Sequence, residues 1–242
     1  SYIMKNSVKK YIMNLIYPPK CVFCRTLLPI STETPVCSKC MSVLPFCLAY
    51  ERCKICGKPI TSADKCEDCR SMPYRHFDKA CAAYIYKDNV KTALIKFKSE
   101  RYSAYARVFA GHMKAVIEND FKKYSFDAVV SVPPRTDRIK SGEYDQAACL
   151  ADELAKLLEL PYYKKVLAQK EKRRKQSDLT AEERIKNVEG NYIVKQKGKI
   201  ENKTLLLVDD ICTTGATLSE CSKVLKNSGA CAVYCATAAT VI

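Results

Sequence analysis

Two carboxylates side by side at the end of an apolar run carry the most distinctive chemistry of this 242-residue chain. The stretch LLLVDDICTTGAT, residues 205–217, runs from aliphatic residues into Asp209 and Asp210 and then into a threonine-rich turn. The apolar run predicts a buried strand, and a helical pattern begins near Ala216. Ligands of open parallel sheets bind at the carboxyl ends of the strands, so we expect both acids to line a binding site.

The turn after the acids has the composition of a phosphate site. Unpaired N–H groups and the helix dipole favour an anion at the start of the next helix. Gly215 allows the backbone to curl closely around a phosphate, and Thr213, Thr214 and Thr217 add hydroxyl donors. The acids, in contrast, accept hydrogen bonds from vicinal hydroxyls or help to hold a divalent cation. Phosphoribosyl pyrophosphate (PRPP) satisfies both halves, and the alternative is a capping cluster on an ordinary helix.

Four Cys-x-x-Cys pairs account for eight of the 15 cysteines. The pairs are Cys21 and Cys24, Cys37 and Cys40, Cys53 and Cys56, and Cys66 and Cys69. Two such pairs supply the four thiolates of a tetrahedral zinc site, so we expect two Zn²⁺ ions in closed, structural sites. Sequential pairing of neighbours is the simplest arrangement, and an interleaved cross-brace stays open. Gly57 can take the positive φ that often follows the second ligand of a knuckle.

Charge and cysteine usage indicate the compartment and the class of partner. The other seven cysteines mostly lie in apolar contexts and are interpreted as buried filler: Cys47, Cys81, Cys149, Cys212, Cys221, Cys231 and Cys235. The odd total and the metal-type spacing favour a reducing compartment, so we expect a cytoplasmic protein. The net charge of +15 favours an anionic partner, and a solvated lysine-rich surface is the alternative.

Apolar periodicity predicts alternating helices and strands after the cysteine-rich part. Strands are expected over 127–134, 204–210 and 230–239, and helices over 88–119 (two helices), 147–160 and 216–228. The face of helix 147–160 that is expected to be buried consists of Leu150, Leu154, Leu157 and Leu158. Strands separated by helices imply a doubly wound, mostly parallel α/β sheet.

Three parts are expected along the chain: a lead-in helix over 1–17, a small double zinc ribbon over 18–75 and the α/β domain over 76–242. The apolar residues of the lead-in fall at helical spacing: Val8, Ile12, Leu15 and Ile16. We expect this amphipathic helix to pack on the rest of the protein rather than on a membrane. No apolar run reaches the roughly 20 residues that a membrane span needs.

The opening stretch resembles the PRPP-binding motif of type I phosphoribosyltransferases. The resemblance implies that the two acids contact the ribose 2′- and 3′-hydroxyls, that the loop holds the 5′-phosphate, and that Mg²⁺ accompanies PRPP. The implied PRPP-binding residues are Asp209, Asp210, Ile211, Cys212, Thr213, Thr214, Gly215, Ala216 and Thr217. By the same analogy, Pro133, Pro134 and Arg135 form the pyrophosphate loop. Arg135 is the expected anion contact, and a plain surface arginine is the alternative.

Other segments resemble the ComF competence proteins (ComFC- or GntX-like), in which a double zinc ribbon precedes a type I phosphoribosyltransferase-like domain. SGEYDQA at 141–147 is similar to the RGFNQ signature, with Gly142, Glu143 and Asp145 in place of its arginine, glycine and asparagine. KQSDLTAEERIKNVEGNY is similar to the family's segment after the signature, and the resemblance implies a hood over the site at 168–189. The implied anion contacts of the hood are Arg173, Arg174, Lys175, Gln176, Arg184 and Asn187, and a solvated loop is the alternative.

The resemblance implies a competence factor that binds PRPP and handles incoming single-stranded DNA. Many purine-using members place a third carboxylate shortly after the acid pair, where this chain has Ile211, Cys212 and Thr213. Neither His76 nor His112 lies in a motif, so no general base is evident, and PRPP binding has more support than catalysis. Two alternatives stay open: a metabolic phosphoribosyltransferase acting on a nucleobase or amine, and a non-catalytic scaffold whose ribbons dock a DNA-uptake helicase or translocation partner.

Overall fold

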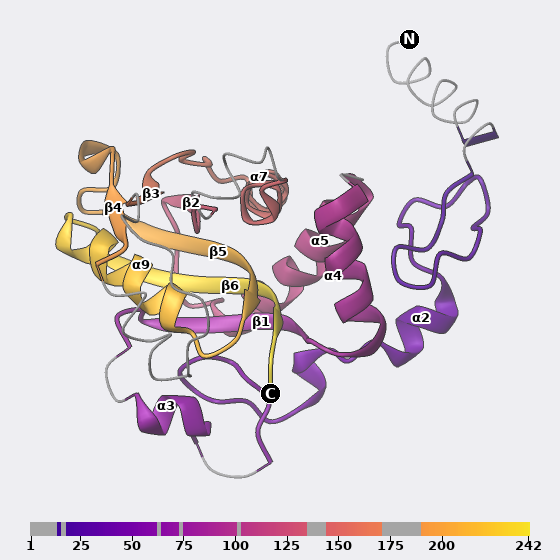
Figure 1. Ribbon diagram of the computed structural model, residues 1–242, viewed down its shortest axis with the longest axis horizontal. Helices are drawn as coiled ribbons and strands as arrows, with labels where there is room; N and C mark the ends of the chain where they lie inside the picture. Colours follow the sequence, from indigo (N-terminus) through magenta and orange to yellow (C-terminus); the bar gives the residue numbers. More distant parts are fainter. Residues whose placement is uncertain are drawn as a thin grey trace.

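The computed structural model describes residues 14–15, 18–61, 64–72, 75–100, 103–134, 144–170 and 190–242. Within these stretches, a sheet of four parallel strands has the order β1-β6-β5-β2 (Figure 1). The strands are β1 (Lys79–Ile85), β2 (Ala128–Ser131), β5 (Thr204–Cys212) and β6 (Ala232–Thr240). A separate antiparallel pair consists of β3 (Leu167–Gln169) and β4 (Tyr192–Val194), and a short 3₁₀ turn, η2 (Lys197–Lys199), follows it. The predicted α/β class is confirmed.

Helices cover both faces of the sheet, because the side chains of each strand alternate between the faces. The helices are α4 (Asp88–Glu100), α5 (Ser103–Asp120), α7 (Gln146–Leu158) and α9 (Ala216–Asn227). Leu206 and Val208 of β5 pack in one core with α4, α5 and α7, whereas Leu205 and Leu207 pack in a second core with α9. All four side chains are fully buried, which explains why the strand reads as an unbroken apolar run.

The apolar pattern predicts three strands of the sheet and misses β1. Its sequence, KACAAYI, holds small residues instead of the β-branched residues typical of strands. The ribbon segments supply the reason, since they bond to the edge of β1 that β6 leaves free. The Ala80 N–H donates to the Ile55 carbonyl at 2.8 Å, and the Ile85 N–H donates to the Pro45 carbonyl at 2.9 Å. Small side chains on β1 let this second backbone come close.

Several element ends differ from the predictions. The strand expected over 127–134 ends at Ser131, ahead of the two prolines, which cannot donate to a ladder. The strand expected over 204–210 continues to Cys212, so the two acids lie within it. Leu150 and Leu154 are buried as predicted, but Leu157 is 40% exposed. The side of α7 that faces the core carries Leu150, Leu154 and Leu158 at four-residue spacing, which leaves Leu157 outside it.

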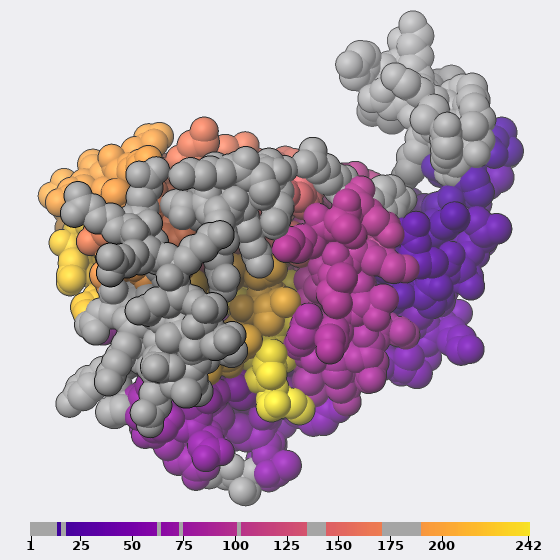
Figure 2. Space-filling model, viewed as in Figure 1, coloured from indigo at the N-terminus to yellow at the C-terminus, as the bar shows by residue number. Residues whose placement is uncertain are grey.

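The ribbons pack against opposite faces of the sheet. The first ribbon (residues 18–50) carries α2 (Ser38–Val43) and η1 (Cys47–Ala49), and its Phe23 ring meets Tyr84 and Phe109 edge-on, with centroids 6.0 Å apart in both pairs. The second ribbon (residues 51–72) carries α3 (Glu67–Ser71), and its cysteines share the core that contains Leu218 of α9. Figure 2 shows the first ribbon, in indigo, along the flank of the magenta helices.

Two predicted segments fall mostly outside the described residues. Asn14 and Leu15 of the lead-in are helical, and the Asn14 amide donates to the Ile30 carbonyl at 2.8 Å, whereas Val8, Ile12 and Ile16 are not described. The hood is described only up to Lys170. Among the described helices, none is both long and apolar enough to cross a membrane. The domain limits at 17 and 75 stay predictions.

Candidate functional site

The acid pair lies near the carboxyl end of β5, beside the start of the loop that follows β2. The Asp210 N–H donates to Asp209 Oδ1 at 2.8 Å, and the Ile211 N–H donates to Asp210 Oδ1 at 2.7 Å. Burial and the neighbouring Asp210 charge raise the pKa of Asp209 well above its usual value. A divalent cation or hydroxyl donors at this point would favour the ionised form of the pair.

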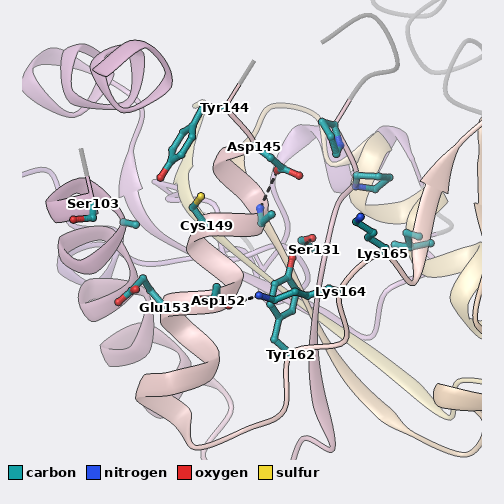
Figure 3. Close-up of a pocket in the computed structure, with 15 residues that line it drawn as sticks. Ser103, Ser131, Tyr144, Asp145, Cys149, Asp152, Glu153, Tyr162, Lys164 and Lys165 are labelled. Carbon is teal, nitrogen blue, oxygen red and sulfur yellow. Dashed lines mark hydrogen bonds and ion pairs between the residues drawn. The ribbon is translucent and has the colours of Figure 1, made fainter. Parts of the chain in front are cut away.

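A third carboxylate, Asp145, completes this acidic group. Asp145 caps α7 by accepting the Ala148 N–H at 2.9 Å (Figure 3). Burial raises its pKa, and the charge of Asp210 adds to the rise, which indicates that the two carboxylates interact. In the sequence, Asp145 stood out only as a departure from the signature asparagine. Asp and Asn cap helices equally well, so the departure keeps the cap and adds an ionisable group.

The loop after β5 leads directly into the first turn of α9. Gly215 has φ 78°, precedes the helix and gives it no side-chain cap. Thr214 Oγ1 accepts the Ala216 N–H at 3.4 Å, while Thr213 is exposed and Thr217 is half-buried. A positive φ is costly for residues with a Cβ, so glycine is the residue that fits here. The structure therefore places the two acids, this loop and α9 in one strand-loop-helix unit, and phosphate binding by the loop stays a prediction.

Two cations from outside the motif touch this loop. Lys58 Nζ donates to the Thr213 carbonyl at 3.2 Å and pairs with the Asp68 carboxylate. Burial lowers the pKa of Lys58, but the hydrogen bond to Asp68 and the charge of Asp68, with smaller contributions from Cys212 and Cys66, together outweigh burial, so the pKa is raised. A Cβ built on Gly215 would lie 2.8 Å from Arg75 Nη1, which places the guanidinium against the loop. Sequence reasoning missed both cations, since neither lies in a motif.

A cavity of about 430 Å³ lies beside the two prolines that are expected to form the pyrophosphate loop (Figure 3). Pro133 and Pro134 line it from the end of β2, and Asp145 and Cys149 line it from α7. Tyr162 also lines it, and its hydroxyl lies 2.8 Å from Ser131 Oγ. The Val132 N–H donates to the Val208 carbonyl at 2.9 Å, which puts this loop directly beside the acid-bearing end of β5.

The anion contacts expected from the hood and from Arg135 lie outside the described residues: Arg135, Arg173, Arg174, Lys175, Gln176, Arg184 and Asn187. The structure therefore brings together the acid pair, the threonine loop and the two prolines of the pyrophosphate loop. These residues come from neighbouring strands, because Ser131 of β2 is paired with Val208 of β5.

The eight paired cysteines form two separate groups. The first cluster is Cys21, Cys24, Cys37 and Cys40, and the second cluster is Cys53, Cys56, Cys66 and Cys69. Within each cluster the sulfur atoms lie within 4.8 Å of one another, and sulfurs in tetrahedral Zn²⁺ sites are about 3.8 Å apart for Zn–S bonds of about 2.3 Å. Both donor sets fit zinc, and the pairing is sequential.

Most of the remaining cysteines are buried, as expected. Cys47, Cys81, Cys212, Cys221 and Cys235 are buried. Cys149 is half-buried and Cys231 is exposed, so the interpretation as buried filler does not extend to these two. Burial raises the pKa of the Cys212 thiol, within the proposed loop, to about 11, so this thiol is neutral at physiological pH.

Comparisons with known proteins match both halves of the chain. The sequence model of the double zinc ribbon domain matches residues 12–70, and that of the phosphoribosyl transferase domain matches residues 145–241. Competence protein F of Haemophilus influenzae is 24% identical over 215 residues, which cover 87% of this chain and 92% of that protein. Competence protein ComFC of Bacillus subtilis is 24% identical, with 85% and 83% covered, and ComFC of Streptococcus pneumoniae is 27% identical, with 87% and 95% covered.

The cysteine clusters, the parallel sheet and these alignments agree along the chain. The ribbon match contains both clusters, and the transferase match runs from the cap of α7 to the end of β6. The chain therefore joins a double zinc ribbon to a phosphoribosyltransferase-like domain and is similar, over most of its length, to competence proteins F and ComFC.

Proposed function

We propose that the protein binds PRPP with Mg²⁺ at the carboxyl end of β5 and acts in competence, where it handles single-stranded DNA. The observation that carries the PRPP assignment is that two carboxylates and a glycine-containing loop at the start of α9 lie in one strand-loop-helix unit. The acids suit ribose hydroxyls and a cation, and the N-terminal turn of α9 after Gly215 suits a phosphate. The two cysteine clusters hold structural Zn²⁺ in this proposal.

Calorimetric titration of the zinc-loaded protein with PRPP and Mg²⁺ tests the assignment. The double variant Asp209→Asn with Asp210→Asn keeps the shape of the pair and removes both charges. We expect the wild-type protein to bind and the double variant to lose binding. The control is Glu33→Gln with Glu118→Gln, which removes the same charge from two exposed acids elsewhere. If the folded wild-type protein does not bind PRPP, the assignment is contradicted. If the double variant still binds PRPP, the PRPP site lies elsewhere in the protein.

Handling of single-stranded DNA rests on the net charge of +15 and on the names of the relatives. Neutralised phosphates release counterions, so we expect the affinity for a labelled oligonucleotide to fall steeply with salt. Each phosphate contact contributes a slope of about −0.7 in log affinity against log salt. Binding that does not depend on salt, or no binding at low salt, contradicts this role.

Transfer of the phosphoribosyl group is a second candidate, and the placement of Asp145 favours it. A half-buried carboxyl with a raised pKa that lines a cavity beside the expected pyrophosphate loop is suited to accept a proton from a nitrogen nucleophile. Asp145→Asn keeps the α7 cap and removes the base. We expect release of pyrophosphate with some nucleobase or amine, and a loss of about 100-fold or more in the variant. Silence of the wild type across a panel of acceptors rejects this candidate.

A further inference from the structure

The second ribbon contacts the proposed phosphate loop, residues 213–215. Asp68 of α3 is the junction, since its carboxylate pairs with Lys58 and its carbonyl accepts Arg75 Nη2 at 3.0 Å. Lys58 then reaches the Thr213 carbonyl, and Arg75 lies against Gly215. Asp68 stands directly before a ligand of the second cluster, Cys69, so the cluster and the loop are joined by one short chain of contacts.

Arg75 is a cation without a full set of acceptors. Its Nε and Nη1 atoms are buried and find no hydrogen-bond partner among the residues that the structure describes. Phe77 lies under the guanidinium, 5.9 Å from the Arg75 carbon to the ring centroid, and offers no acceptor oxygen. Arginine remains charged at all relevant pH values, and buried charged donors are unfavourable unless an acceptor pairs with them.

The groups around Arg75 leave its charge available. The Asp68 carboxylate is engaged by Lys58, whose side chain is only 12% exposed. The Cys212 thiol, 3.7 Å from the point where a Gly215 Cβ would stand, is neutral because burial raises its pKa. A phosphate in the loop would bring the missing negative charge.

We propose that Arg75, held by the Asp68 carbonyl of the second ribbon, is the cation of the subsite that holds the 5′-phosphate monoester of PRPP. This inference rests on the proposed function. Lys58 is a positioning residue, because it donates to the Thr213 carbonyl of the loop. The second ribbon is then part of the ligand site as well as a folded support, and the first ribbon, on the other face of the sheet, is not.

Titration with two probes separates a phosphate contact from a general loss of structure. Ribose 5-phosphate carries only the monoester, whereas pyrophosphate with Mg²⁺ carries only the leaving group. For Arg75→Gln we expect the affinity for ribose 5-phosphate to fall by roughly tenfold to a hundredfold, as for lost hydrogen bonds to a charged group. We expect the affinity for pyrophosphate to stay within about twofold. Arg70→Gln is the control, since Arg70 is exposed on α3 and its loss changes the charge equally.

The outcomes are distinct from failure of the proposed function. A wild-type protein that does not bind PRPP rejects the proposed function itself. A wild-type protein that binds PRPP while Arg75→Gln keeps full affinity for ribose 5-phosphate overturns the inference, as does an equal loss for both probes. If the Gln variant loses zinc, Arg75→Lys decides: zinc-loaded protein with affinity within about fivefold of wild type supports a charge role, and a larger loss overturns it.

Discussion

The two cysteine clusters share one knuckle geometry and differ in what surrounds it. The residue after the second cysteine is left-handed in both, with φ 66° at Arg25 and φ 71° at Gly57. All four cysteines of the second cluster are buried, whereas Cys24 of the first cluster is exposed and Cys37 is half-buried. The knuckle turn therefore fixes the positive φ of the residue after the second cysteine. The packing around the turn decides which residue type can stand at that position.

Close packing explains why only one knuckle needs glycine. A Cβ on Gly57 would lie 2.8 Å from the Ala80 carbonyl oxygen and from the Cys81 Cα, which are backbone atoms of β1 and cannot move aside. Arg25 instead has room for a side chain, which pairs with Glu100 at 3.0 Å. The same strained φ is thus tolerated at the open knuckle and restricted to glycine at the closed one.

The largest expected difference comes from removing one ligand of each cluster. We expect Cys69→Ser to remove one Zn²⁺, to lower the free energy of unfolding by about 5 kcal/mol and to abolish PRPP binding, since the second cluster is joined to the loop. We expect Cys24→Ser to remove one Zn²⁺ and to leave PRPP binding within a few-fold of wild type. Metal analysis, denaturant unfolding and calorimetry check the pair. Equal losses of PRPP binding in both variants would show that the clusters do not differ in this way.

The next difference concerns the knuckle residues. Gly57→Ala combines a positive φ with a clash against backbone, so we expect it to lower the free energy of unfolding by about 2–4 kcal/mol. Arg25→Gly relieves strain of about 1 kcal/mol and loses a half-exposed ion pair worth about 0.5 kcal/mol, so we expect a change of less than about 1 kcal/mol. Urea unfolding of both variants measures the contrast. A Gly57→Ala protein as stable as wild type would refute the close contact with β1.

The smallest expected effect is the pH dependence of the free energy of unfolding that comes from Asp209, on the strand whose following loop the second ribbon contacts. Because the folded-state pKa of Asp209 is raised, the folded protein favours the protonated form and loses stability as the pH rises from the ordinary carboxyl range through that pKa. We expect Asp209→Asn to raise the free energy of unfolding by about 1–2 kcal/mol at neutral pH and hardly at all near pH 3. Thermal unfolding across this pH range follows the effect.

Asp127→Asn is the control with the opposite sign. The Thr204 N–H, followed by Lys203, lowers the pKa of Asp127. Its stabilising contribution is present at neutral pH and is lost as the pH falls through the folded-state pKa. We therefore expect the variant to be less stable than wild type at neutral pH and equal to it in acid. A gain in stability at neutral pH for Asp127→Asn, or a loss for Asp209→Asn, would contradict the assigned environments.

The features that can be predicted from the sequence are those whose motif lies within one short stretch of the chain. The Cys-x-x-Cys pairs and the run from Leu205 to Thr217 each carry their chemistry within a few residues, and the structure forms both units. The site residues that sequence reasoning misses are those placed by contacts between distant segments. Lys58 meets Thr213 across 155 residues, and Asp145 joins the acid pair only because α7 starts beside β5. β1 escapes notice because packing, not β-propensity, selects its small residues.

The pairing of β1 with β6 has a consequence for synthesis of the chain. The Asp78 N–H donates to the Val233 carbonyl at 2.8 Å, and the Val233 N–H donates to Asp78 Oδ2 at 2.8 Å, across 155 residues. At about 5–20 residues per second, β1 leaves the ribosome roughly 8–30 s before its partner strand is complete. The ribbons emerge first and cover the other edge of β1. The ribbons thus protect one edge of β1 during synthesis. Only the edge that later pairs with β6 stays open to mispairing until that strand is complete.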